Sequence, residues 1–221
     1  MTILNKQSIY DDKSVVILGT GAHAKVVIEI IECMGGYDII GVCSSDPNAP
    51  ASLCGYEYLG DFNILDDLYP KGLRLAAMGV GGWTDNTFRK QVFNDAKRRG
   101  FNLLTAIHPK SMVAQNTIIG EGCIVDAGAN LMTEAVIGRN CIVSVSSLIS
   151  HESTLADHVL VSGVAKIGAQ VTIETGAVIA FGATVVSRLK IGENAVVAAG
   201  AVVLHDVKDN TTVFGIPAKI K

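Results

Sequence analysis

The chain has 221 residues, of which 49% are hydrophobic, and carries a net charge of −3 at neutral pH. It can therefore bury a core, and its longest basic cluster, 97–99, is too small to indicate a nucleic acid or an anionic membrane as a partner. The five cysteines show no metal-ligand spacing, which favours reduced thiols over disulfides or a metal site.

Residues 1–13 lack the apolar core of a signal peptide. No stretch of the sequence approaches the roughly 18 to 20 apolar residues of a membrane span. We therefore expect a cytoplasmic protein.

Residues 14–106 alternate between strand-like and helix-like segments. The strand-like segments are 14–21, 38–45 and 73–81, and the helix-like segments are 23–35 and 84–100. This alternation predicts a small parallel sheet with crossover helices, which is a Rossmann-like α/β arrangement.

A glycine-rich turn, GTGAHA at 19–24, follows the first strand and opens the first helix. It resembles a dinucleotide fingerprint, but Ser44 and Ser45 stand where the acidic residue for the ribose is expected, so we expect no NAD. The turn is still suited to phosphate, because Gly21, Ala22 and the amide of His23 lie at a helix N-terminus.

From residue 113 the pattern changes to a period of six. Every sixth residue is aliphatic, namely Val113, Ile119, Val125, Leu131, Ile137, Val143, Ile149, Leu155, Val161, Ile167, Ile173, Ile179, Val185, Ile191, Val197 and Val203. A second register, four residues after each aliphatic, is mostly Ala, Ser or Cys, and the residue before it is often Gly or Asn. The spacing predicts a triangular coil of about five turns, with three short strands per turn and positive φ at its corners.

The segment SLISHEST at 147–154 places a histidine at one of these corners. Ser147, Ile149 and Ser153 take the inward positions, so His151 and Glu152 are the two corner residues. Neutral imidazole is a suitable base near pH 7, and a carboxylate beside it can orient the ring. We predict that His151 is a general base helped by Glu152, with the alternative that the two adjacent side chains point apart.

Four segments together resemble one family of enzymes. They are LGTGAHAKVV at 18–27, AMGVGGWTDNTFRK at 77–90, SLISHEST at 147–154 and VFGIPAKI at 213–220. The chain resembles the left-handed β-helix (hexapeptide-repeat) acyltransferases that act on nucleotide-linked 4-amino sugars, together with the related sialic acid O-acetyltransferases. The resemblance implies an α/β nucleotide-sugar-binding domain over 1–108 and a left-handed parallel β-helix over 109–221.

The same resemblance implies the ligands and their residues. The acyl donor is acetyl-CoA, no metal is implied, and the protein forms a homotrimer with active sites between subunits. Gly21, Ala22, His23, Ser44, Ser45, Gly79 and Arg89 are expected to bind the nucleotide-linked amino sugar, and Leu160, Ala169, Phe181 and Ala199 the CoA.

Relatives often carry Asp-Asp at the positions of Ser44 and Ser45, which leaves the nucleotide base open. The alternative for Arg89 is a surface helix residue. Leu160 occupies the slot of a cofactor-contacting histidine, with His158 as a weaker candidate, and Trp83 is expected to cover the domain junction.

The expected activity is N-acetylation of a nucleotide-linked 4-amino-4,6-dideoxy sugar for polysaccharide or glycan synthesis, by direct attack on the thioester. Two alternatives remain at this point. One is a sugar O-acetyltransferase using the same corner, and the other is a non-catalytic trimer that binds sugar nucleotides.

Overall fold

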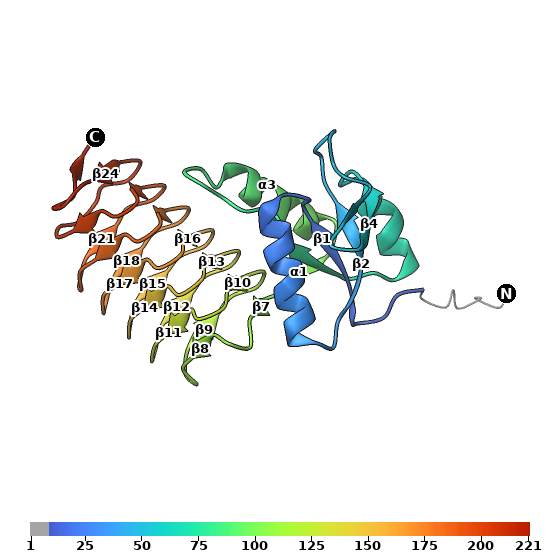
Figure 1. Cartoon of the computed structure of the whole chain (residues 1–221), viewed down its shortest axis with the longest axis horizontal. Coiled ribbons are helices and arrows are strands. Elements are labelled where there is room, and N and C mark those ends of the chain that lie inside the picture. The colour runs from blue at the N-terminus through green and yellow to red at the C-terminus, as the bar shows by residue number, and fades with distance from the viewer. Residues whose placement is uncertain (1–8) are drawn as a thin grey trace.

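The computed structural model describes residues 9–221 (Figure 1). Residues 1–8 lie outside the described residues, and they include the start of the predicted first domain and most of the segment 1–13 that lacks the apolar core of a signal peptide. Within the described part, none of the helices combines the length and apolarity that a bilayer crossing needs.

The N-terminal half is built on a six-stranded sheet in the order β3-β4-β2-β1-β5-β6. Its strands are β1 (Ser14–Leu18), β2 (Asp38–Cys43), β3 (Ser52–Leu53), β4 (Tyr56–Gly60), β5 (Leu75–Met78) and β6 (Asn102–Leu103). All pairings are parallel except β3 with β4, which form a hairpin. The parallel core β2-β1-β5 was predicted from the strand-like segments, whereas β3, β4 and β6 were not.

Helices cover both faces of this sheet. They are α1 (Ala22–Met34), α2 (Ile64–Leu68) and α3 (Thr87–Arg98), with a short 3-10 turn η1 (Tyr69–Lys71). β1 is buried throughout: Val15 and Ile17 belong to the core with α1, and Val16 and Leu18 to the core with α3. Burial on both faces explains why β1 is a continuous apolar run instead of an alternating one.

The C-terminal half is a coil of two-residue strands that form three parallel sheets. The first sheet contains β7 (Ala106–Ile107), β10 (Ile124–Val125), β13 (Ile142–Val143), β16 (Leu160–Val161), β19 (Val178–Ile179), β22 (Val196–Val197), β24 (Thr212–Phe214) and the antiparallel β25 (Lys219–Ile220). The second contains β8 (Met112–Val113), β11 (Asn130–Leu131), β14 (Leu148–Ile149), β17 (Lys166–Ile167), β20 (Thr184–Val185) and β23 (Val202–Val203). The third contains β9 (Ile118–Ile119), β12 (Val136–Ile137), β15 (Thr154–Leu155), β18 (Thr172–Ile173) and β21 (Lys190–Ile191).

The six-residue repeat is confirmed residue by residue. Of the sixteen inward aliphatics, all are buried except Val113 and Ile119, which lie in the first turn and are partly exposed. The expected positive φ is found at every corner glycine and asparagine singled out in the sequence, namely Gly122, Asn140, Gly128, Gly176, Gly182, Asn194 and Gly200. The fold is therefore a Rossmann-like α/β half followed by a left-handed parallel β-helix, as the sequence predicted.

The two ends of the coil depart from the repeat. β7 already pairs with β10, so the coil begins before residue 109, and the division into domains at that residue remains a prediction. At the other end Ile191 bridges to Val207, only sixteen residues later, so the last turn is two residues shorter than the others.

The first sheet of the coil joins the two halves. Its outward residues Ile124, Ile142, Leu160 and Val178 belong to the same buried cluster as the apolar face of α1. Figure 1 shows α1 beside the first turns of the coil, with β24 at the far end. This contact fixes the α/β half against the turns that precede and follow the His151 corner.

Candidate active site

His151 and Glu152 form a hydrogen-bonded pair at the corner between β14 and β15. The Nδ1–H of His151 donates to Oε2 of Glu152 at 2.9 Å. Because an ionised carboxylate only accepts hydrogen bonds, the ring proton lies on Nδ1, and the lone pair of Nε2 stays available. The alternative that the two side chains point apart does not hold.

Two side chains from later turns hold Glu152 in place. Gln170 donates from Nε2 to Oε2 of Glu152 at 3.1 Å, and Arg188 donates from Nε to Oε1 of Gln170 at 3.1 Å. The three residues are eighteen apart and share the same left-handed corner conformation, with φ of 58° to 64°. The hydrogen bond from His151, followed by that from Gln170, lowers the pKa of Glu152, so this carboxylate is ionised at neutral pH.

The corner stands on a buried polar floor with a hollow on each side. Ser153 is fully buried, donates to the carbonyl of Gly168 at 2.8 Å and accepts from the amide of Val171 at 3.1 Å. The hollow of about 420 Å³ on one side of His151 is lined by 132–134 and 151–152. The hollow of about 460 Å³ on the other side is lined by Leu148, Ser150, His151, Lys166, Ile167, Gly168, Ala169, Thr184, Val185, Val186 and Ser187.

A second pocket, of about 310 Å³, lies at the carboxyl ends of β1, β2 and β5. Ligands bind at this edge of open parallel sheets. Five of the seven residues predicted to bind the nucleotide-linked sugar line it together, namely Gly21, Ala22, His23, Ser44 and Gly79. Thr20, Asp46, Gly81 and Phe88 also line it and were not singled out in the sequence.

Two glycines let the loops after β1 and β5 cross closely at the base of this pocket. A Cβ on Gly19 would lie 2.8 Å from the carbonyl of Gly79, and Gly19 also has a φ of 130°. A Cβ on Gly79 would lie 2.8 Å from Cγ2 of Ile17 and 3.0 Å from Cβ of Ala24. The 2.8 Å approaches at both glycines are shorter than a Cβ tolerates, so the crossing requires glycine at these positions.

The N-terminus of α1 opens onto the same pocket. Gly21 is its N-cap without a side-chain cap, and the first turn carries no acidic residue. The amides of Ala22 and His23 can therefore receive an anion such as phosphate. Burial, and after it the charge of Arg89, lowers the pKa of His23 to about 4, so this ring is neutral at pH 7. Its Nε2 is buried and has no hydrogen-bond partner among the residues that the structure describes.

At the end of β2 the acidic group is Asp46 instead of either serine. Ser44 is buried, accepts the amide of Asp46 on its Oγ at 3.1 Å and accepts the Tyr58 hydroxyl on its carbonyl at 3.0 Å. Ser45 is exposed and does not line the pocket. A carboxylate is therefore present in this pocket two residues beyond Ser44, although Ser44 and Ser45 stand where relatives often carry Asp-Asp.

Arg89 does not line the pocket at the ends of β1, β2 and β5. Its side chain is 1% exposed, with Nη2 donating to the carbonyl of His158 at 2.8 Å and Nη1 to that of Asn140. Arg89 therefore contacts the coil and not the substrate pocket for which it was predicted. It is also not a surface residue of the helix, which was the alternative. Burial lowers the pKa of Arg89 to about 10, which leaves it protonated at neutral pH.

The four residues predicted to bind CoA lie apart within one chain. Ala169 lines the larger hollow beside His151, whereas Phe181 and Ala199 are exposed at the next corner of the coil. Leu160 is 4% exposed and packs in the cluster between the two halves. Phe181 is 61% exposed, so its side chain is available to a ligand or to another subunit.

Two further expectations change. Trp83 does not cover the junction, because its side chain is 83% exposed. His158 is buried on a different corner from His151, where its Nδ1 accepts from Nδ2 of Asn140 at 2.9 Å and its ring stands edge-on to Phe93. It therefore does not reach the hollows beside His151.

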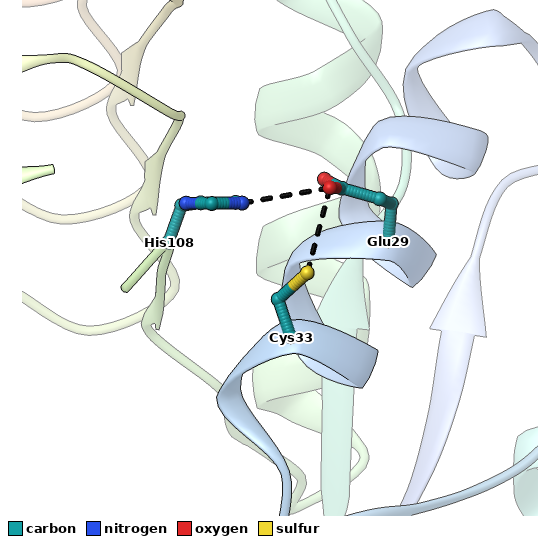
Figure 2. Close-up of side chains that lie close together, drawn as sticks. All are labelled: Glu29, Cys33 and His108. Atoms are coloured by element: carbon teal, nitrogen blue, oxygen red, sulfur yellow. Dashed lines mark hydrogen bonds and ion pairs between the residues drawn. The ribbon is translucent and has the colours of Figure 1, made fainter. Parts of the chain in front are cut away.

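Glu29, Cys33 and His108 form a cluster whose composition suits a metal ion. Figure 2 shows the His108 ring and the Cys33 thiol both directed at the Glu29 carboxylate. However, Nδ1 of His108 accepts the amide of Lys110 at 2.9 Å, which places the ring proton on Nε2, the nitrogen 3.5 Å from Glu29. A metal-bound imidazole needs the opposite tautomer, so the cluster is a polar contact between α1 and the coil, with Nε2 of His108 3.5 Å from the Glu29 carboxylate.

The chain is similar to known acetyltransferases. Residues 14–96 match the family model of the PglD N-terminal domain. UDP-N-acetylbacillosamine N-acetyltransferase of Bacillus subtilis (strain 168) is 32% identical over 122 residues, which span 52% of this chain and 52% of that protein. The match thus spans about half the length of this curated relative.

Two solved structures match nearly the whole chain. A histidine-to-alanine mutant of GDP-perosamine N-acetyl transferase from Caulobacter crescentus, in complex with CoA and GDP-perosamine, has a TM-score of 0.90 at 30% identity, covering 96% of this chain and 98% of that one. The acetyltransferase domain of PglB from Neisseria gonorrhoeae FA1090, in complex with acetyl coenzyme A, has a TM-score of 0.87 at 28% identity, covering 96% and 100%.

Proposed function

The chain belongs to the hexapeptide-repeat family of sugar N-acetyltransferases, and we propose that it transfers an acetyl group from acetyl-CoA to the 4-amino group of a nucleotide-linked 4-amino-4,6-dideoxy sugar. The observation that carries the proposal is the hydrogen bond from Nδ1 of His151 to Glu152, which leaves Nε2 free to act as a base. The pocket after β1, β2 and β5 supports a nucleotide as the other part of the acceptor.

In the proposed reaction the neutral amine attacks the thioester carbonyl directly. The C–N bond forms while Nε2 of His151 takes the proton from nitrogen, and Glu152 stabilises the imidazolium. The C–S bond then breaks, and the CoA thiolate leaves with the proton that Nε2 returns. No side chain becomes acylated, and the base is restored at the end of each turnover.

The oxyanion of the tetrahedral intermediate needs a donor in the turn after His151. The amides of Gly168 and Gln170 already donate to backbone carbonyls. The amide of Ala169 donates to the hydroxyl of Ser187 at 3.0 Å, which can rotate away. We therefore assign this role to Ala169, which lines the same hollow as His151.

We further propose a homotrimer with its active sites between subunits. His151 and Ala169 lie on one corner of the coil, whereas Phe181 and Ala199 lie on another. A groove between two coils would bring the first pair of one subunit to the second pair of its neighbour, which a single chain does not do.

The test is a panel of UDP-, dTDP- and GDP-linked 4-amino sugars with acetyl-CoA, followed by release of free thiol. We expect turnover with one of these acceptors, and His151→Asn should lower kcat for it at least tenfold because proton transfer loses its base. CoA affinity, measured by calorimetry, should be the same in the variant. Silence across the panel with activity on sialic acid would select the O-acetyltransferase instead.

A further inference from the structure

Helix α3 lies along a column of corners on the coil, between the third sheet and the first. A helix rises about 4.5 Å in three residues and stacked strands are about 4.8 Å apart, so helix residues three or four apart meet successive turns. The contacts in order are Asn86 with His158 and Gly176, Arg89 with Asn140 and His158, Phe93 over Gly122, and Lys97 with Glu121 at 2.7 Å.

The first two of these contacts satisfy backbone groups of the coil. The corner carbonyls of Asn140, His158 and Gly176 accept no backbone hydrogen bond from the residues that the structure describes. Asn86 donates from Nδ2 to the carbonyls of His158 at 3.2 Å and Gly176 at 3.1 Å, and Arg89 donates to those of Asn140 and His158. Because buried carbonyls need donors, these two side chains fix which turn of the coil faces which turn of α3.

Among residues 9–221, only carbonyl oxygens bond to the guanidinium of Arg89, through Nη1 and Nη2, and its Nε has no hydrogen-bond partner. It is 1% exposed, and no carboxylate within residues 9–221 pairs with it. Burying a cation is costly, and an apolar side chain of similar volume often gives equal stability. What an apolar side chain cannot supply is the two-pronged bond that sets the register between α3 and the coil.

This register bears on the nucleotide pocket, because the pocket wall leads directly into α3. Gly79, Val80 and Gly81 line the pocket, and Phe88, beside Arg89, lines it again. Asn86 and Arg89 therefore bond the end of the loop 79–88 and the start of α3 to the coil, on the side away from the pocket. A shift of α3 along the corner column would displace the wall at Phe88.

We propose that Arg89 is a positioning residue which, through its bonds to the corner carbonyls of Asn140 and His158, sets the loop 79–88 for binding the nucleotide of the acceptor. This inference rests on the proposed function for its ligand. In this role Arg89 does not contact the substrate. The coil then positions the acceptor pocket as well as the residues that bind the acyl donor.

The test compares Arg89→Met, Arg89→Lys and the matched control Arg98→Met. Arg98 lies on the same helix, and its one ion pair within residues 9–221 is with Asp95 at the surface. Calorimetry with GDP, UDP and dTDP as probes should show at least fivefold weaker binding of the tightest nucleotide by Arg89→Met. CoA affinity should stay within twofold, because the corner of His151 does not depend on α3. Arg89→Lys should recover part of the loss, and Arg98→Met should bind as the wild type does.

Hydrogen exchange of the loop amides at 80–88 gives a readout without ligand. It should be faster in Arg89→Met than in the wild type, while amides of the coil at 160–197 keep their protection. If Arg89→Met and the wild type have equal nucleotide affinity or equal loop exchange, the inference about Arg89 is wrong and the proposed function is unaffected. A wild type that binds none of the three nucleotides would contradict the proposed function and the inference with it. If Arg89→Met does not fold, Arg89→Lys decides by the same measurements.

Discussion

Glu152 faces His151 because of where the corner places its backbone. Its φ of 58° turns the residue back over the coil, and Gln170 from the next turn holds the carboxylate there. Asparagine, glycine or aspartate would adopt this conformation more readily than glutamate does. Gln170 and Arg188 share this conformation, so the φ only places the carboxylate beside the ring. The hydrogen bond from Nδ1 of His151 is the observation that supports a role in orienting it.

Glu152→Gln tests this role at the residue scale. The amide oxygen of glutamine can still accept from Nδ1 of His151, but the negative charge that stabilises the imidazolium is lost. We expect kcat to fall roughly two- to fivefold, since the pair is exposed and screened by solvent. Steady-state kinetics would measure this fall in kcat. Glu174→Gln is the control, because Glu174 is a carboxylate of the coil that pairs with Lys190. An unchanged kcat in Glu152→Gln would remove the helper role.

Gly79→Ala tests the close crossing of the loops beneath the nucleotide pocket. Its Cβ would meet Ile17, Ala24 and the Leu18 carbonyl at 2.8 to 3.0 Å, so the crossing must open. Overpacking of this kind costs about 1 to 3 kcal/mol, which thermal unfolding would detect. Gly21→Ala is the matched control, because its Cβ would meet nothing within 4 Å. Equal melting temperatures for the two variants would contradict the argument.

Among the elements, those with a long apolar signature were predicted and the short ones were not. The apolar run 15–18 identifies β1 in the sequence, and the apolar face of α1 identifies that helix. β3 and β4 escaped notice because their two-residue turn, Cys54–Gly55, is not one of the usual hairpin signals, although both residues have positive φ. β6 has two residues, too few for any period to be visible in the sequence.

The contact between α3 and the coil also predicts a dependence of stability on pH. Burial lowers the pKa of His158 to about 4 from an unfolded value of 6.5. The unfolded chain therefore binds more protons between these values, so stability is complete above pH 6.5 and declines as the pH falls toward 4. At pH 5 the loss for one such histidine is about 2 kcal/mol, or several degrees in melting temperature.

Thermal unfolding at pH 7 and pH 5 would measure this effect. His158→Asn, which suits the corner φ of 64°, should lose part of the difference between the two pH values. The remainder should come from His23, whose pKa burial also lowers to about 4. A wild type equally stable at both pH values would show that neither ring stays neutral in the folded state.

For the whole molecule, the coil and the α/β half lie along one long axis, and α1 and α3 belong to the half that packs beside the first turns (Figure 1). The corner of His151 is left uncovered by the α/β half, as are Phe181 and Ala199. The exposure of these residues agrees with a trimer in which the coils associate through the sides that the α/β half does not cover. It also separates, within one chain, the residues that we assign to one active site.

Sedimentation should therefore give about three times the chain mass of 23.2 kDa. Coexpression of His151→Asn with Ala199→Trp would test shared sites, because a mixed trimer can combine the intact base of one subunit with the intact Ala199 corner of its neighbour. We expect such mixtures to recover activity that neither variant shows alone. A stable monomer, or mixtures without recovery, would remove the shared-groove arrangement.

The sequence by itself determined the coil, its inward side chains, its left-handed corner positions and the corner of His151 and Glu152. These follow from a strict local period, because each six-residue segment repeats the same backbone path and the same steric demand. The tertiary structure alone decided the orientation of Glu152, the entry of Asp46 into the nucleotide pocket and the burial of Arg89. Arg89 bonds to residues 51 and 69 positions away, and no local pattern can specify contacts between segments that meet only after folding.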